Sequence, residues 1–307
     1  MTKTILFACP RMEPLARKIA DRCSRVELGR VDWLRFEDGF PNLMIHAVES
    51  IRGRDVAFLA CFDTPGTILE QLGVIYELPR YGAGSLKIIL PYFPTGTMER
   101  VSREGEIATA HTLARVLSET PLTMKGPAEL VIFDIHALQE RFYFKDTVVP
   151  RLTSAIPLLR SRLSLLEDAS KVAIAFPDEG AWKRFGTHFD DYAQIICHKV
   201  RDGAKRVVTL KEGDPQGKHV VMVDDLVKTG GTLLECRRFL SELGARAVSA
   251  YVTHGVFPEE SWRRMTPADF AHFWITDSCP ATVDAVDRRA PFEVLSLAEP
   301  LVTILEA

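Results

Sequence analysis

The segment from Val220 to Thr232 reads VVMVDDLVKTGGT and combines an apolar run, an acidic pair and a turn of small residues. The apolar run has the length of a short buried strand, and Asp224 and Asp225 end it abruptly. The glycines permit a tight turn, and a helical pattern follows. The order strand, acidic pair, loop, helix is typical of α/β folds, in which ligands bind beyond the carboxyl ends of parallel strands.

The turn at 229–232 has the chemistry of a phosphate-binding loop. Gly230 and Gly231 allow backbone N–H groups to point at an anion, and the helix that follows adds its positive end. Thr229 and Thr232 add hydroxyl donors. Carboxylates at the strand's end can accept hydrogen bonds from ribose hydroxyls. A plain strand-to-helix turn, capped by the aspartates, is the alternative that this segment alone leaves open.

Short apolar runs of strand length recur along the chain, separated by amphipathic segments. They are Val56–Phe62, Lys87–Phe93, Leu130–Ile135, Lys171–Phe176, Val220–Val223, Ala247–Val252 and Phe270–Ile275. Alternating strands and helices over 307 residues predict an α/β protein with two mainly parallel sheets. We expect one domain over 1–150 and a second over 151–291, with 292–307 packing back on the first.

Composition narrows the class of protein. The net charge of −3 and the lack of a strongly basic stripe argue against a nucleic-acid partner. No apolar run reaches the roughly 20 residues of a membrane-spanning helix, and the N-terminus has no signal pattern. The six cysteines are scattered without Cys-x-x-Cys spacing, which favours a reducing cytoplasm over a disulfide framework.

Two segments predict a place for a metal-bound nucleotide. Asp134 and His136 follow an apolar run two residues apart, so on an extended chain both would point to one face. Asp178 follows another such run and could share a divalent metal with His136. In isolation, a helix-capping aspartate and a hydrogen-bonded histidine explain Asp134 and His136 better than a metal site does, and a capped helix start explains Asp178 equally well.

Two further segments carry phosphate-compatible chemistry. Lys199 and Arg201 flank Val200, so both cations would point the same way and could stabilise a migrating phosphoryl group. A solvated charged face is the alternative. The polar stretch 201–218 predicts a mobile loop able to close over a substrate. The segment 91–100 predicts the end of a strand followed by a turn of small residues. The turn could contact a phosphate, but the ordinary residue preferences of a turn also explain its composition.

These segments occur in the order and spacing of the ribose-phosphate pyrophosphokinases, also called phosphoribosyl pyrophosphate synthetases. The resemblance covers almost the whole chain and is strongest to the plant-type, phosphate-independent class. The shared strings are FPTGT at 93–97, FDIHALQERFYF at 133–144, GAWKRF at 180–185 and FWITDSC at 273–279. An ordinary phosphoribosyltransferase would match only the segment at 224–232.

The resemblance implies two phosphoribosyltransferase-like (Rossmann-like) domains, each a mainly parallel sheet flanked by helices. It implies transfer of the β,γ-diphosphoryl group of MgATP to the C1 hydroxyl of ribose 5-phosphate, which yields phosphoribosyl pyrophosphate and AMP. Mg²⁺ would be the cofactor, and the chain would associate with itself as a dimer or a larger assembly. The alternatives are a phosphoribosyltransferase that consumes phosphoribosyl pyrophosphate and a non-catalytic regulatory homologue.

Matched position by position, the resemblance also implies roles for individual residues. Lys199 and Arg201 would be the catalytic pair, and His136 and Asp178 would handle the metal. Ribose 5-phosphate would be bound by Asp224, Asp225, Lys228, Thr229, Gly230, Gly231 and Thr232. ATP would be bound by Phe36, Asp38, Thr97, Met98, Arg100 and His136, with Phe36 and Asp38 often reaching a neighbouring subunit's site.

Some positions depart from the commoner class of the family. Thr97 and Met98 stand in place of an Arg-Gln pair, so Arg100 or Arg103 is a candidate replacement. Lys228 stands where an acidic residue is usual, and Phe40 stands where a glutamate is usual. The plant-type class shares departures of this kind, which affect nucleotide contacts and regulation more than they exclude activity.

Overall fold

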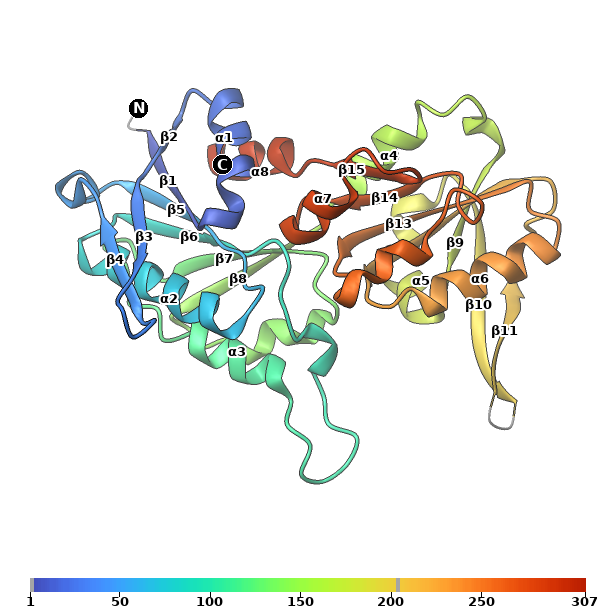
Figure 1. The fold of residues 1–307 in the computed structure, drawn as a ribbon, viewed down its shortest axis with the longest axis horizontal. Coiled ribbons are helices and arrows are strands. Elements are labelled where there is room, and N and C mark those ends of the chain that lie inside the picture. The colour runs from blue at the N-terminus through green and yellow to red at the C-terminus, as the bar shows by residue number, and fades with distance from the viewer. Residues whose placement is uncertain (1–2, 203–204) are drawn as a thin grey trace. The chain divides into compact units, whose positions relative to one another are not determined.

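The computed structural model describes residues 3–202 and 205–307, with the backbone alone for 199–202 and 205–207. The chain forms two compact units, Met1–Ser154 with Leu297–Ala307 and Ala155–Ser296. Each contains a mainly parallel sheet flanked by helices, as Figure 1 shows, which confirms the α/β fold predicted from the alternating pattern.

The first unit contains a sheet of six parallel strands in the order β2-β1-β5-β6-β7-β8. Their bounds are β1 Thr4–Ala8, β2 Val26–Leu28, β5 Asp55–Leu59, β6 Ser85–Ile89, β7 Ala128–Phe133 and β8 Val148–Thr153. The chain proceeds in one direction from β1 to β2 and in the other from β5 to β8. Because such crossovers are right-handed, helices must cover both faces.

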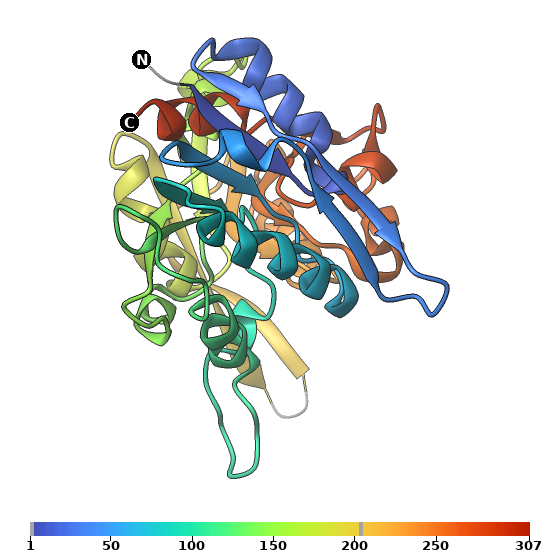
Figure 2. The same cartoon turned by 90° about the vertical axis from the view of Figure 1, so that its left-hand side faces the viewer.

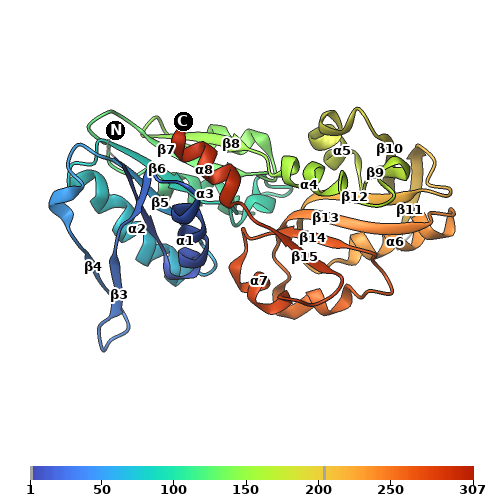
Figure 3. The same ribbon diagram turned by 90° about the horizontal axis from the view of Figure 1, so that it is seen from above.

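Helices α1 (Glu13–Arg22) and α8 (Ala298–Glu306) pack together on one face of this sheet, and α2 (Pro65–Arg80) and α3 (Thr109–Leu117) cover the other. Figure 3 shows α8, the last helix of the chain, beside α1. The buried side chains Leu301 and Ile304 explain why the amphipathic C-terminal segment returns to the first unit.

A two-stranded antiparallel ribbon of β3 (Val31–Arg35) and β4 (Pro41–Ile45) extends beyond the first sheet (Figure 2). At its tip the Phe36 N–H donates to the Phe40 carbonyl at 2.9 Å, and the Asp38 carboxylate accepts the Phe40 N–H at 3.1 Å. Large apolar side chains are exposed along the ribbon and its tip: Leu34, Phe36, Phe40 and Met44.

The second unit contains a seven-stranded sheet in the order β11-β10-β9-β12-β13-β14-β15. The bounds are β9 Val172–Phe176, β10 Ala193–Asp202, β11 Lys205–Glu212, β12 His219–Val227, β13 Ala247–Gly255, β14 Phe273–Thr276 and β15 Phe292–Leu295. Its helices are α4 (Ile156–Leu163), α5 (Glu179–Phe185), α6 (Gly231–Glu242) and α7 (Pro280–Val286). All neighbouring strands are parallel except β10 and β11.

Short 3₁₀ helices connect several of these elements. They are η1 (Pro10–Met12), η2 (Val48–Ser50), η3 (Gly96–Met98), η4 (Leu138–Tyr143), η5 (Ala169–Lys171), η6 (Gly186–Phe189) and η7 (Pro258–Arg264).

The central strand β12 is buried on both faces. Val220 and Met222 belong to a core with α6, while Val221 and Val223 belong to a core with α4 and α5. Burial on both faces is the reason the sequence shows a continuous apolar run here rather than an alternation.

Strand β12 does not stop at the acidic pair, which corrects the sequence interpretation. It runs on to Val227, and its pairing with β13 includes Asp224 with Val252 and Val227 with Gly255. The backbone ladder continues because β13 is equally long, whereas the sequence signal came from side-chain polarity alone.

The mobile loop expected over 201–218 is also partly wrong. Within that stretch Lys205–Glu212 forms β11, paired antiparallel with β10. Val208 is buried in the same core as Cys197 of β10, which anchors the hairpin despite its polar composition.

The terminal stretch 292–307 divides between the units rather than packing as a whole on the first. Phe292–Leu295 pairs with β14, and Phe292 lies within an aromatic cluster, 5.1 Å from Phe273 and 5.8 Å from Phe257 between ring centroids. This aromatic packing holds β15 in the second sheet, and the chain returns to the first unit at Leu297.

A buried histidine joins the amino-terminal ends of the strands in the second sheet. His219 is 3% exposed, with Nδ1 3.1 Å from Asp168 and Nε2 2.8 Å from the Ser249 hydroxyl. Asp168 also pairs with Arg246. Burial lowers the pKa of His219, so the folded protein holds this imidazole neutral.

We expect the free energy of unfolding to decrease as the pH falls below about 6.5, the value for an exposed histidine, because the unfolded chain then binds a proton that folded His219 excludes. Above that pH this contribution is fully present. Urea unfolding of the wild type and of His219→Gln between pH 8 and pH 5 measures it. The variant, whose side chain does not titrate, should have a shallower pH dependence, and equal slopes would contradict this account.

Candidate functional site

The carboxyl ends of β9 and β12 lie side by side at the centre of the second sheet. The two strands pair in parallel, with Met222 opposite Ala175, and from them the chain proceeds toward opposite edges of the sheet. Such a switch point is where open α/β sheets bind ligands. Asp178 follows β9, and Asp224 and Asp225 lie near the carboxyl end of β12. The parallel pairing of the two strands therefore brings three carboxyl groups to one edge of the sheet.

These acids repel one another. Loss of surrounding water, together with the neighbouring carboxylates of Asp225 and Asp178, holds the pKa of Asp224 well above its usual range. Asp225 is 5% exposed and lies 3.7 Å from an Arg184 guanidinium nitrogen. Asp178 caps α5 by accepting the Ala181 N–H at 3.0 Å. The edge therefore carries excess negative charge that a cation or hydroxyl donors would relieve.

The 229–232 loop follows β12, and its conformation requires glycine. Gly230 has φ of +73°, and a Cβ there would lie 1.9 Å from the Met265 methyl carbon. Helix α6 begins at Gly231, and the Leu234 N–H donates to the Gly230 carbonyl at 3.0 Å. The structure thus places a left-handed glycine turn directly before the N-terminus of a helix, and phosphate binding there stays a prediction.

The segment after β13 packs behind this loop. The Ser261 hydroxyl donates to the Lys228 carbonyl at 2.9 Å, and Arg264 donates to the Thr229 carbonyl at 2.8 Å. Sequence reasoning missed both residues because they lie more than 30 positions from the loop and form no motif with it. Arg184, which pairs with Asp225, likewise forms no motif with it in the sequence, although it lies in the GAWKRF string at 180–185.

The backbone of Lys199 and Arg201 lies in β10, next to β9. The parallel register ends with Ile196 opposite Phe176, so β10 continues past the end of β9 toward the edge that carries Asp178. Residues two apart on a strand project to the same face. The side chains of both cations lie outside the part of the chain that is described, so their roles remain predictions.

In the first unit, two segments meet at the carboxyl edge of β6 and β7. A Cβ on Gly96 would lie 3.4 Å from the His136 Cβ and 3.5 Å from a Glu140 carboxylate oxygen, so η3 and the 136–140 segment are in contact. Thr97 and Met98 belong to η3. The structure therefore brings these two residues near His136.

Other predicted nucleotide ligands are arranged differently. Asp134 adopts φ of +37° directly after β7 and is buried, whereas His136 is exposed, so the two do not form one exposed set of ligands. Arg100 is exposed and lies 3.4 Å from Glu99. Phe36 and Asp38 lie at the tip of the β3–β4 ribbon, where the described interactions link them to neither η3 nor His136.

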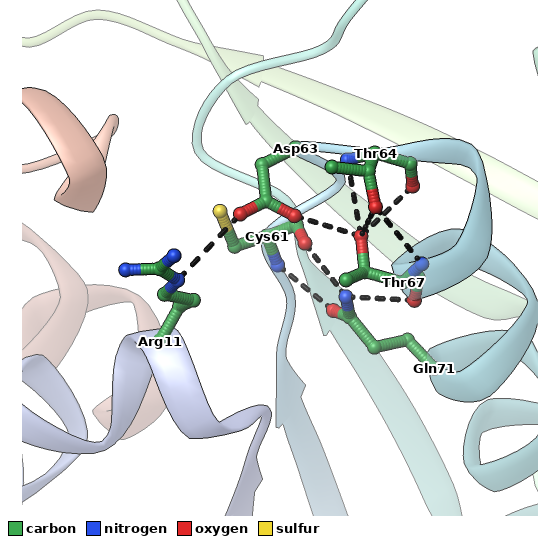
Figure 4. A network of polar contacts seen from close by, with 6 residues as sticks. All are labelled: Arg11, Cys61, Asp63, Thr64, Thr67 and Gln71. Carbon is green, nitrogen blue, oxygen red and sulfur yellow. Dashed lines mark hydrogen bonds and ion pairs between the residues drawn. The ribbon is translucent and has the colours of Figure 1, made fainter. Parts of the chain in front are cut away.

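A polar network that the sequence did not indicate joins β5 to α2 at the same edge (Figure 4). Gln71 accepts the Cys61 N–H at 2.9 Å and donates to the Cys61 carbonyl at 2.6 Å. Thr64 caps α2, Thr67 donates to Asp63 at 2.7 Å, and Arg11 lies 3.7 Å from Asp63. The network fixes the strand-to-helix connection beside the end of β6.

Among the described residues, no group of three or more histidine, cysteine or acidic side chains could hold a metal ion. Mg²⁺ commonly retains several waters and binds through one or two carboxylates plus substrate phosphates. The carboxylate of Asp178 is a hard oxygen donor of the kind that such a cation accepts.

Over the described residues, no helix has the length and apolar character needed to cross a membrane.

We expect Asp224→Asn to stabilise the folded protein, because it removes a carboxyl group whose ionisation is unfavourable there. At low pH the wild-type carboxyl is protonated, so the gain should be small. It should grow as the pH rises from about 3.9, the value for an exposed aspartate, toward the raised pKa of the folded protein, and should level off above that pKa. Thermal melting of the variant at pH 5 and pH 8 tests this, with Asp190→Asn, a change at an exposed aspartate, as the control. A gain that does not increase with pH would contradict the expectation.

Comparison with known proteins assigns the family. A model of the N-terminal domain of ribose phosphate pyrophosphokinase matches residues 4–120, and a model of the phosphoribosyl transferase domain matches residues 139–280. Ribose-phosphate pyrophosphokinase 3, chloroplastic, from Oryza sativa subsp. japonica is 54% identical over 98% of this chain and 76% of its own length. Ribose-phosphate pyrophosphokinase 4 from Arabidopsis thaliana is 54% identical over 99% of this chain and 92% of its own length.

The fold agrees with these matches. The crystal structure of phosphoribosylpyrophosphate synthetase from Mycobacterium smegmatis superposes with a TM-score of 0.84 at 26% identity, over 100% of this chain and 98% of the other. The two domain models together cover most strands of both sheets, and β7 and β15 lie outside the matched residues. The chain therefore belongs to the ribose-phosphate pyrophosphokinase family.

Proposed function

We propose that this chain is a ribose-phosphate diphosphokinase, which transfers the β,γ-diphosphoryl group of ATP to the C1 hydroxyl of ribose 5-phosphate. The C1 oxygen forms a bond to the β-phosphorus, the bond between that phosphorus and the α,β-bridging oxygen breaks, and AMP leaves. The supporting observation is the acidic pair followed by the 229–232 loop at the switch point of the second sheet, in a member of this family.

Ribose 5-phosphate fits the chemistry of that edge. The 5-phosphate would bind at the 229–232 loop, where backbone N–H groups and the positive end of α6 converge. The side chains of Thr229 and Thr232 add donors, and Lys228 adds a positive charge near the phosphate. Asp224 and Asp225 would accept hydrogen bonds from the ribose hydroxyls, which relieves part of their repulsion.

The nucleotide would be bound by Thr97, Met98, Arg100 and His136 of the first unit. Mg²⁺, assigned to His136 and Asp178, would neutralise the triphosphate charge when bound. Lys199 and Arg201 would stabilise charge on the migrating group, since phosphoryl transfer depends mainly on positioning and charge stabilisation.

The placement of Phe36 and Asp38 supports self-association. Both lie at the tip of a ribbon that carries four exposed apolar side chains and extends beyond its own sheet. We propose that the ribbon reaches the nucleotide site of a second copy, so that the active protein is at least a dimer. All six cysteines are free thiols, which supports a reducing compartment such as the cytoplasm.

The activity is tested by incubating the protein with MgATP and ribose 5-phosphate and measuring AMP and phosphoribosyl pyrophosphate. Both products should appear together and should require magnesium. Pyrophosphate release that depends on an added nucleobase and phosphoribosyl pyrophosphate would instead favour a phosphoribosyltransferase. The absence of both reactions would favour a regulatory homologue.

We expect Lys199→Ala to lower turnover by about two to three orders of magnitude, the usual loss when a donor to transition-state charge is removed. Because the residue lies on a hairpin strand, the melting temperature should change little. Lys171→Ala, which removes an exposed lysine before β9, is the matched control and should keep turnover near that of the wild type. Near-normal turnover of the Lys199 variant would refute the catalytic role.

A further inference from the structure

Three successive carbonyl groups of the 228–230 backbone are held by hydrogen bonds on the side away from the proposed phosphate site. Lys228 O accepts from the Ser261 hydroxyl at 2.9 Å, and Thr229 O accepts from the Arg264 guanidinium at 2.8 Å. Gly230 O accepts the Leu234 N–H at 3.0 Å, as the first hydrogen bond of α6. Two of these three partners come from η7, which is remote in sequence.

Holding a carbonyl also orients the next N–H group. A trans peptide is planar, and its C=O and N–H point in opposite directions. The three restrained carbonyls therefore direct the N–H groups of Thr229, Gly230 and Gly231 away from Ser261, Arg264 and the body of α6. Within the described part of the chain these three N–H groups have no hydrogen-bond partner. They are donors available to an anion beyond the helix terminus.

The η7 segment is itself firmly held. Trp262 is buried, with the Arg263 and Arg289 guanidinium carbons 4.7 Å and 5.3 Å from its ring centroid. Met265 is 2% exposed and fills the space where Gly230 lacks a Cβ. The buried side chains of Trp262 and Met265 anchor the segment that carries Ser261 and Arg264, whereas exposed Arg263 only covers the outer face of Trp262.

Backbone strain in this segment supports a functional reason for its conformation. Phe257, Glu259 and Glu260 have φ values of +40°, +53° and +56°, in the left-handed region that costs non-glycine residues of order 1 kcal/mol or more each. Such strain persists where the surrounding packing over-determines it and is common next to binding sites. Here it directs the chain so that 261–265 runs behind the loop.

Arg264 differs from Ser261 in charge. A hydrogen bond from a guanidinium is stronger than one from a hydroxyl, and it polarises the peptide whose N–H belongs to Gly230. The same positive charge lies one peptide away from the proposed 5-phosphate. It would favour a dianionic ligand without touching it.

We propose that Arg264, assisted by Ser261, is a positioning residue for ribose 5-phosphate: it holds the 229–232 loop with its N–H groups toward the 5-phosphate. The inference rests on the proposed function of that loop. It assigns to η7 the role of a rigid support that determines affinity for the sugar phosphate and leaves the nucleotide site unaffected.

Arg264→Gln, Arg264→Lys and Ser261→Ala test the proposal, with Arg263→Gln as the matched control. The neighbouring Arg263 pairs with Glu260 and lies over Trp262 but does not touch the loop. We expect the KM for ribose 5-phosphate to rise about ten- to a hundredfold in Arg264→Gln, the usual effect of losing a charged hydrogen bond. Ser261→Ala should show a smaller rise and Arg264→Lys a partial recovery, while the KM for ATP and the melting temperature stay near wild type.

Calorimetric binding of ribose 5-phosphate provides a readout independent of turnover. The dissociation constant should increase in Arg264→Gln and remain unchanged in Arg263→Gln. Equal affinity of wild type and Arg264→Gln would overturn the positioning role, as would parallel increases in KM for both substrates or an equal loss in the control. Failure of the wild type to form AMP would refute the proposed function instead, and the calorimetric comparison would still decide the role of Arg264.

Discussion

The parallel pairing of β9 with β12 is the contact on which the candidate site depends. It brings the end of β9, with Asp178, and the acidic pair of β12 to one edge of the sheet, although these residues are more than 40 positions apart in the chain. Both strands are buried on both faces, so their register is held by two separate cores. A shift of one residue would turn the apolar side chains of β12 into the wrong core and move the acids away from the 229–232 loop.

That edge combines features that oppose stability with features that support binding. The clustered carboxyl groups repel one another, Gly230 needs a left-handed conformation, and η7 together with its N-cap Phe257 contains three strained residues. The apolar packing of two cores on opposite faces of the second sheet offsets these destabilising contributions. The same edge presents acceptors for sugar hydroxyls beside N–H donors that have no partner among the described residues, and a sugar phosphate requires this combination.

Several parts of the fold and site followed from local pattern, and the errors have identifiable causes. The run at 220–223 predicted a buried strand correctly because continuous apolarity reflects burial on both faces. The same reasoning ended the strand too early, since Asp224 and Asp225 remain in the backbone ladder with β13. Polar composition likewise concealed β11, where one buried residue, Val208, anchors an otherwise hydrophilic hairpin. Phe292 was assigned to the returning C-terminus because its aromatic partners are distant in sequence.

The sequence by itself determined the α/β class, the acidic pair, the glycine turn and the family, because each depends on neighbouring residues or on strings shared across the chain. Tertiary structure decided which strand ends meet, which carboxyl group is destabilised and what supports the loop. Arg264 and Ser261 illustrate the division. The residues next to them in the sequence form no recognisable motif. Their importance arises only because β13 and η7 bring them within hydrogen-bonding distance of the carbonyl groups of residues 228 and 229. Hydrogen bonds and desolvation act through space, so a linear pattern cannot record them. For the 220–232 segment, the sequence revealed the chemistry and the fold determined its geometry.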